Sequence, residues 1–376
     1  MQIYTIPTIN PDLFTFWIYF YGDDSKYMAG ERHFLEHLLL GTNSKYSKED
    51  FRLNITKLGD DSLLSAATST EFITLSGSYL LEDAGKIMEL IDLMLNDASL
   101  LEDEIEKERK IIVQEYKGGV DNLIRQCYQS LGKILGVELT AIGNLDSINQ
   151  INKLGLQQTY EGVINTDACH IYAHGIDVEK IFENFKIRDG EQHLTKFKPE
   201  GNYHTVNDKI SSSLVMLMYD EPFSVNSALL TSYLSSTSGP LFTELREKQQ
   251  LCYAVSALET FSGKYRCPYL TTYGISAKNP ELLVTGLHEH FTVENQDIFE
   301  SLIKAQKINY AHAKNNIEQR LAMEKQAQQL GVTFEDLSKW PTWKEFREYA
   351  YTVREKGVQA TMVVESGLIR GEKDGS

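Results

Sequence analysis

Residues 32–42 read RHFLEHLLLGT, a stretch that places two histidines and a glutamate inside an otherwise apolar run. The spacing of the apolar residues predicts a helix over residues 30–40. On a helix, His33 and His37 are one turn apart, with their Cβ atoms roughly 5–6 Å from each other. Two imidazoles at this separation can bind one zinc ion at about 2.0–2.1 Å each. Glu36 lies beside them on the same face, where it can take a proton from a water molecule.

The order H-x-x-E-H is the inverzincin signature, the reverse of the commoner H-E-x-x-H zinc motif. A single histidine on an apolar helix is more often a hydrogen-bonded core residue than a metal ligand. Two histidines at ligand spacing, with a glutamate between them, favour a metal site at residues 33–37 over that reading.

The composition indicates a globular protein with more than one domain. The chain has 376 residues, about right for two domains, and 42% of them are hydrophobic and 24% charged. No run of about 18 apolar residues is present, so no membrane span is predicted. The first residues, MQIYTIPTINPDLF, contain no basic region and no long apolar core, and we therefore predict no secretory signal.

Cysteine usage and charge bear on the compartment and the partner. The cysteines form no C-x-x-C pair, which favours buried thiols in a reducing compartment and a cytoplasmic location: Cys127, Cys169, Cys252 and Cys267. The net charge of −16 argues against a nucleic-acid partner. It would suit cationic peptides, although many cytosolic proteins are acidic simply for solubility.

A repeated order of elements predicts a duplication. Strand, helix, helix, strand, strand, helix are predicted over residues 13–95, and the same order returns over residues 212–291, at an offset of nearly 200 residues. We therefore predict an α+β fold with two duplicated domains, each a mainly antiparallel sheet covered by helices on one face. The predicted parts are an N-terminal domain (1–188), a linker (189–208) and a C-terminal domain (209–376).

A third metal ligand has to come from outside the first helix, because catalytic zinc sites usually have three protein ligands. Residues 102–117 are predicted to form a helix that is rich in carboxylates. Glu108 and Glu115 are seven residues apart and share one face. Glu115 follows the apolar run at 111–113, which favours an inward orientation. The pattern alone does not decide between the carboxylates of this helix, and most of them fit a solvated face.

The stretch from Gly30 to about Gly119 resembles the pitrilysin/insulinase family of zinc peptidases, which includes the mitochondrial processing peptidases and their small bacterial relatives. Three segments carry the resemblance: HFLEHLLLGT (33–42), LLSAATSTEFITL (63–75) and ERKIIVQEY (108–116). It implies one Zn²⁺ per chain, a base, a supporting carboxylate that orients the site, and three ligands. These are Glu36 as base, Glu108 as the supporting carboxylate, and His33, His37 and Glu115 as ligands.

The same resemblance implies a substrate-binding strand at Ser65, Ala66, Ala67 and Thr68, to which a peptide would add by main-chain hydrogen bonds. The family strand usually has asparagine at the position of Ser65. A serine hydroxyl can still form hydrogen bonds, but it lacks the amide that both donates and accepts.

The second copy has no metal motif, since residues 226–234 read NSALLTSYL. The segment LFTELREKQQLCYAVSA (241–257) resembles the family's C-terminal motif, in which an arginine and a tyrosine contact the substrate. These are Arg246 and Tyr253 here, and Gln250 replaces a family glycine. Without the resemblance, the two would read as a surface arginine and a half-buried strand tyrosine.

The resemblance implies a zinc-dependent endopeptidase that cleaves peptides or unfolded segments inside a chamber built from four such domains, and so from two chains. Three alternatives stay open. The pair can be a homodimer or a heterodimer with a related subunit. The enzyme can be a general oligopeptidase or a peptide-maturation protease. The chain can also be a non-catalytic structural or substrate-capturing subunit of a heteromeric peptidase.

Overall fold

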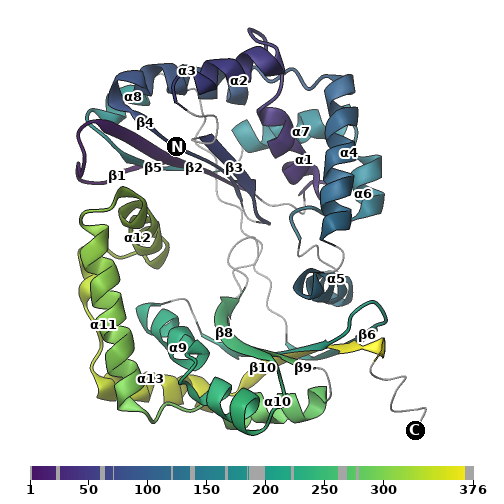
Figure 1. Ribbon diagram of the computed structural model, residues 1–376, viewed down its shortest axis with the longest axis vertical. Coiled ribbons are helices and arrows are strands. Elements are labelled where there is room, and N and C mark those ends of the chain that lie inside the picture. Colours follow the sequence, from purple (N-terminus) through teal and green to yellow (C-terminus); the bar gives the residue numbers. More distant parts are fainter. Residues whose placement is uncertain are drawn as a thin grey trace. The chain divides into compact units, whose positions relative to one another are not determined.

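The computed structural model forms two compact units, each built on a five-stranded sheet (Figure 1). Unit 1 comprises Met1–Gly118, Thr140–Thr195 and Ala311–Gln328, and unit 2 comprises Gly119–Leu139, Lys196–Tyr310 and Gln329–Ser376. The residues that the structure describes are 2–22, 26–59, 64–70, 72–119, 122–135, 140–165, 168–183, 185, 200–221, 224–260, 269–276 and 279–368.

The elements of unit 1 follow the predicted order closely. They are β1 (Gln2–Thr5), β2 (Leu13–Tyr21), α1 (Glu31–Leu39), α2 (Lys48–Thr56), β3 (Leu64–Thr68), β4 (Phe72–Leu80), α3 (Ala84–Asn96), α4 (Glu102–Gly118), α6 (Leu145–Gln150), α7 (Lys153–Asn165), β5 (Ala168–His174), α8 (Val178–Ile181) and most of α12 (Ile317–Leu330).

Unit 2 contains β6 (Gly201–Asn207), β7 (Ser213–Asp220), α9 (Val225–Ser235), a π-helix (Phe242–Lys248), β8 (Ala254–Thr260), β9 (Tyr269–Ser276), α10 (Pro280–Glu289), most of α11 (Gln296–Ala313), α13 (Trp343–Lys356), β10 (Val358–Ser366) and α5 (Leu123–Leu135).

The two sheets share one topology. Sheet 1 has the order β1-β5-β2-β4-β3, and sheet 2 has the order β6-β10-β7-β9-β8. In each sheet the first pair is parallel and the remaining pairs are antiparallel. The position-by-position match confirms the predicted duplication and the mainly antiparallel α+β architecture.

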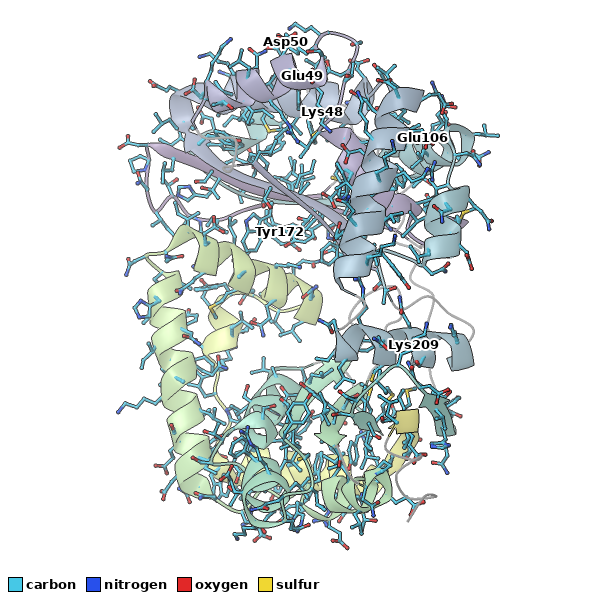
Figure 2. The ribbon with its side chains drawn as sticks, turned by 45° about the vertical axis from the view of Figure 1, so that its right-hand side comes forward. Lys48, Glu49, Asp50, Glu106, Tyr172 and Lys209 are labelled. Atoms are coloured by element: carbon cyan, nitrogen blue, oxygen red, sulfur yellow. The ribbon has the colours of Figure 1, made fainter. Side chains whose placement is uncertain are left out.

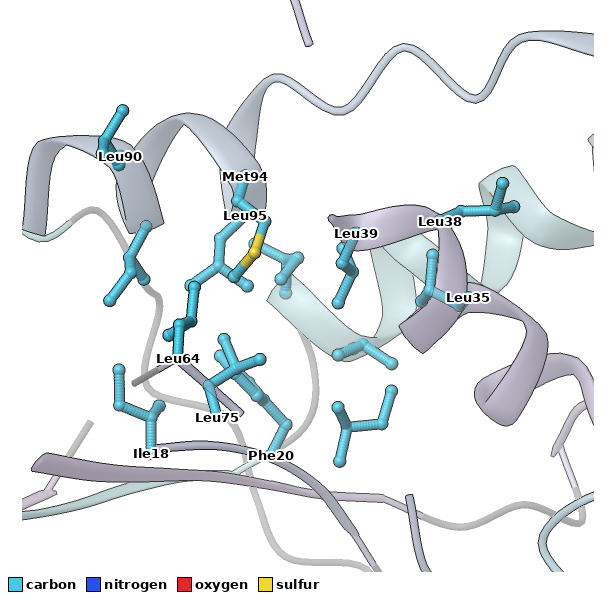
Figure 3. Close-up of a cluster of buried hydrophobic side chains, with 14 of the residues drawn as sticks. Ile18, Phe20, Leu35, Leu38, Leu39, Leu64, Leu75, Leu90, Met94 and Leu95 are labelled. Atoms are coloured by element: carbon cyan, nitrogen blue, oxygen red, sulfur yellow. The ribbon is translucent and has the colours of Figure 1, made fainter. Parts of the chain in front are cut away.

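The core of unit 1 lies between sheet 1 and its helices (Figure 3). Strand β2 contributes Phe16, Ile18 and Phe20 to it, all fully buried. Helix α1 contributes Leu35, Leu38 and Leu39, and Figure 3 shows Leu90, Met94 and Leu95 of α3 in the same cluster. Burying an apolar side chain of this size contributes roughly 1.5–3 kcal/mol to the free energy of unfolding. This packing therefore fixes α1 against the sheet.

Both sheets carry a helix on their second face, which corrects the prediction of helices on one face only. In unit 1, Leu321 of α12 is fully buried against Tyr19, Tyr21 and Tyr172. Tyr172 lies on this face of the sheet, away from α2 (Figure 2). In unit 2, Cys127 of α5 is buried among the β7 and β10 side chains. Strand β2 is therefore aromatic and apolar along both faces because both are covered.

The predicted linker at 189–208 is wrong in its last part. Residues 201–207 form β6, which pairs in parallel with β10, and residues 189–199 lie outside the described residues. The polar side chains of β6 resemble those of a linker because β6 is an edge strand, paired only with β10, and its residues are exposed or half-buried. Whether residues 1–188 and 209–376 are independent domains stays a prediction.

Two further observations concern the cysteines and the helices. Cys127, Cys169 and Cys252 are buried thiols, as predicted, while Cys267 lies outside the described residues. Among the helices that the structure describes, none has both the length and the apolar character needed to cross a bilayer.

Candidate metal centre

Helix α1 divides its side chains between the core and the site. The apolar residues Phe34, Leu35 and Leu38 are buried, whereas the polar residues of the motif face the other way and keep some exposure. The helix begins after Gly30, whose φ is 90°. A Cβ at this position would lie 2.6 Å from the carbonyl oxygen of Ile142, so the close approach and the left-handed backbone both require glycine.

Helix α4 supplies the carboxylates. Its first turn is tied to the end of α1, because Glu104 Oε1 accepts a hydrogen bond from Thr42 Oγ1 at 2.5 Å and Glu104 Oε2 accepts one from the Thr42 backbone N–H at 3.3 Å. Glu108 lies one turn further along α4 and Glu115 two turns after that, on the same face. Glu108 is buried, with 7% of its side chain exposed, whereas the Glu115 side chain is 49% exposed.

The structure brings His33, His37 and Glu115 together. Glu115 Oε2 lies 3.3 Å from His33 Nε2 and 3.6 Å from His37 Nε2. Two ligand atoms of a tetrahedral zinc ion, each at about 2.0–2.2 Å, are separated by roughly 3.3–3.5 Å. The observed separations are therefore close to the edges of a zinc coordination tetrahedron.

Glu36 is another carboxylate near the histidines, and it competes with Glu115 for the role of third ligand. His33, Glu36 and His37 can each offer one ligand atom, with all three atoms within 4.8 Å of one another. However, Glu36 Oε2 approaches His33 at Nδ1, at 3.6 Å, and accepts a hydrogen bond from Thr68 Oγ1 at 3.2 Å. Glu115 approaches both histidines at Nε2 through one oxygen, which fits a shared ligand position better.

Glu36 binds a proton more readily than an exposed carboxylate does, because it is largely removed from water. Removal from water raises the pKa of Glu36, and the nearby His37 and the Thr68 hydrogen bond only partly offset this effect. A carboxylate whose pKa is raised toward neutrality is better suited to accept a proton and then release it.

Glu108 orients His37 and is itself held by a lysine. Its Oε2 accepts a hydrogen bond from His37 Nδ1 at 3.2 Å, and its Oε1 lies 2.5 Å from the Lys48 ammonium. Burial alone would raise the pKa of Glu108, but these two partners outweigh it and lower the pKa to about 2. Burial lowers the pKa of His37, and the Glu108 hydrogen bond with the surrounding carboxylates outweighs that effect and raises it.

The donor set fits a divalent cation. With Nδ1 of His37 donating to Glu108, its Nε2 lone pair points to the shared position. When Glu36, Glu108 and Glu115 are all ionised, they bring three negative charges and Lys48 brings one positive charge, which leaves two negative charges for a divalent cation to balance. Two imidazoles and carboxylate oxygens are ligands that zinc accepts.

The predicted substrate strand is at the edge of sheet 1. Strand β3 pairs with β4 and is the last strand in the sheet order. Ser65 and Ala67 are exposed, whereas Ala66 packs against the core beside α1. The Thr68 hydroxyl donates a hydrogen bond to Glu36, so the end of the strand and the expected base are in contact.

Arg246 and Tyr253 belong to unit 2, and both come before β8 in the sequence. Arg246 lies in the π-helix, is 45% exposed and has its guanidinium carbon 4.7 Å from the centroid of the Phe242 ring. Tyr253 is 54% exposed. Gln250 between them has a φ of 51°, a left-handed conformation that explains why glycine is favoured at this position.

Solved structures of similar fold agree with this architecture. A protease from Helicobacter pylori superimposes with a TM-score of 0.78 at 15% sequence identity, covering 96% of each chain. The peptidase M16 inactive domain from Pseudomonas fluorescens gives a TM-score of 0.73 at 14% identity, covering 97% of this chain and 95% of that one. The paired α+β units therefore have the two-domain fold of M16 peptidases.

Sequence comparisons agree with the fold. Residues 22–129 match the family model for insulinase, peptidase family M16. An uncharacterised zinc protease from Rickettsia bellii is 22% identical over 355 residues, which cover 86% of this chain and 82% of the relative. Residues 22–129 thus have the sequence pattern of a peptidase M16 domain of the insulinase/pitrilysin family, and the matched region contains the residues of the candidate metal centre.

Proposed function

We propose that this protein is a zinc-dependent endopeptidase that cleaves peptides or unfolded segments. The single observation that carries the proposal is the convergence of His33 Nε2, His37 Nε2 and one oxygen of Glu115, with Glu36 beside them. In this proposal His33, His37 and Glu115 hold the ion, and Glu108 orients His37. The family match and the zinc-protease relative support the same reading.

The chain's own residues account for the proton transfers. A zinc ion at this position would supply Lewis-acid polarisation of the scissile carbonyl and would acidify the attacking water. Glu36 takes a proton from the water as the water oxygen bonds to the carbonyl carbon. When the C–N bond breaks, Glu36 delivers that proton to the leaving amine nitrogen. Thr68 holds Glu36 Oε2 in place through its hydroxyl.

Substrate would bind as an added strand beside β3, using main-chain hydrogen bonds at Ser65 to Thr68. Arg246 would contact a peptide carbonyl or carboxylate, and Tyr253 would donate to the developing oxyanion. Each chain carries both sets of residues, so a homodimer enclosing a chamber fits the proposal, with a peptide-maturation role as one form of it.

The test compares three single variants with the wild-type chain. Glu36→Gln should keep its zinc, measured by elemental analysis, and lose about 10²–10⁴-fold in peptide turnover. Glu115→Gln should lose both zinc and turnover. Glu89→Gln, which alters an exposed carboxylate with 63% side-chain exposure, is the control and should change neither.

Turnover is measured by mass-spectrometric mapping of cuts in a mixed peptide pool, with and without a chelator. Full activity of the Glu36→Gln variant would remove Glu36 from the mechanism. If Glu115→Gln retains zinc and Glu36→Gln loses it, the roles are exchanged: Glu36 is then the third ligand and Glu115 the base. A wild-type chain that takes up no added zinc would favour the non-catalytic subunit instead.

A further inference from the structure

Lys48 is the first residue of α2, and its place there runs against local preference (Figure 2). Ser47 caps this helix by accepting a hydrogen bond from the Asp50 N–H. The positive end of the helix dipole disfavours a cation at the first position, and the first turn is otherwise acidic, with Glu49 and Asp50. A residue that breaks a local rule is often held by a tertiary contact.

That contact is made with Glu108. The Lys48 ammonium lies 2.5 Å from Glu108 Oε1, and only 23% of the Lys48 side chain is exposed. The other oxygen, Oε2, accepts the hydrogen bond from His37 Nδ1. Each oxygen of this buried carboxylate therefore has its own partner, and the two partners fix the plane of the carboxylate.

We propose that Lys48 is a positioning residue for the metal centre, acting through Glu108 on His37. By holding Oε1, Lys48 keeps Oε2 directed at His37 Nδ1, and so keeps His37 Nε2 directed at the ligand position. It also prevents the Glu108 carboxylate from turning toward the ion as a competing ligand. This inference rests on the proposed zinc function and adds a residue to it that the H-x-x-E-H motif does not include.

A lysine three positions earlier provides a matched control. Lys45 Nζ pairs with Glu89 Oε1 at 2.9 Å, but both side chains of this pair are about half exposed or more, at 49% and 63%. Exposed ion pairs contribute little to the stability of the fold, so Lys45→Met should leave the metal centre unchanged. Lys48→Met removes the same charge from the buried pair.

The experiment measures zinc affinity of the full-length chain by competition with a chromophoric chelator. Residues that orient a ligand typically contribute 10–100-fold to metal affinity. We expect Lys48→Met to weaken zinc binding about 10-fold, Lys48→Arg to recover most of the loss, and Lys45→Met to have no effect. In a Glu108→Gln background, Lys48→Met should cause little further loss, because the two residues act in one chain of contacts.

Thermal unfolding of the metal-free variants separates positioning from folding. An unchanged zinc affinity of Lys48→Met, with or without a lower unfolding temperature, would overturn the proposal and leave the zinc function intact. An equal loss in the Glu108→Gln background would also overturn it. If Lys48→Met does not fold, Lys48→Gln replaces it with the same expectations. If the wild-type chain binds no zinc, both the proposed function and this inference are refuted.

Discussion

Gly77 in the middle of β4 offers a quantitative test of the packing that supports the site. It pairs with Phe16 of β2 on one side and with Leu64 of β3 on the other. An added Cβ would lie 2.7 Å from Tyr79 Cε2 and 2.9 Å from Phe16 Cζ, where ordinary contacts begin near 3.4 Å. Phe16 is fully buried and Tyr79 is 2% exposed, so neither ring has free space into which it can move.

Gly77→Ala should therefore destabilise unit 1. Overpacking of a filled core costs about 1–3 kcal/mol. The better strand preference of alanine offsets about 0.5–1 kcal/mol, which leaves a net loss of up to about 2.5 kcal/mol. At about 2–4 °C per kcal/mol for a unit of this size, the unfolding temperature should fall by up to about 10 °C.

The control is Gly85→Ala in the first turn of α3. A Cβ at Gly85 meets nothing within 4 Å, so helix propensity alone should raise the free energy of unfolding by up to about 1 kcal/mol. Both changes affect unit 1 and can be followed in the same calorimetric transition. If Gly77→Ala unfolds at or above the wild-type temperature while Gly85→Ala is stabilised, the packing argument fails.

Three further predictions use other parts of the chain. His174 is fully buried, and its Nε2 accepts hydrogen bonds from the Ile9 and Asn10 backbone N–H groups, which requires the neutral imidazole. Burial lowers the pKa of His174, so below about pH 6.5 the unfolded chain gains a proton that the folded chain does not. The free energy of unfolding should fall as pH decreases through this range, and His174→Gln should lack that component in denaturant titrations at several pH values. Gln250→Gly removes a side chain from a left-handed position and should keep the free energy of unfolding or raise it by up to about 1 kcal/mol, measured by chemical denaturation, and a clear loss would contradict the backbone argument. Leu321→Ala should destabilise unit 1 by about 2–5 kcal/mol, measured by chemical denaturation, and a loss below 1 kcal/mol would show that α12 is weakly bound to its sheet.

Local patterns were sufficient for much of the fold. The order strand, helix, helix, strand, strand, helix that is predicted over residues 13–95 is present as β2, α1, α2, β3, β4 and α3. These elements are determined by residues close in sequence, namely caps, turns and a period of apolar side chains. Strand β6 was missed because its stability comes from pairing with β10, which is more than 150 residues away.

The candidate site also has one part that local sequence predicts and another part that depends on tertiary packing. The spacing of His33, Glu36 and His37 is visible in a single helical turn, and their proximity follows from it. The choice of Glu115 needed the packing of α4 against α1, which the sequence suggested only by resemblance. Lys48 gave one weak signal, a cation at the first position of a helix, and its partner Glu108 lies 60 residues away.

Helix α12 comes after most of unit 2 in the sequence but packs in unit 1, and this order has a consequence for biosynthesis. The aromatic face of sheet 1 receives its covering helix from residues 317–330, yet the last strand of that sheet, β5, ends at His174. Between residues 174 and 328 about 150 more residues have to be translated, which takes roughly 8–30 s at 5–20 residues per second. For that interval the nascent chain presents a finished sheet with a bare tyrosine-rich surface. Chaperone contact during translation should concentrate in this window and end once α12 has left the ribosome.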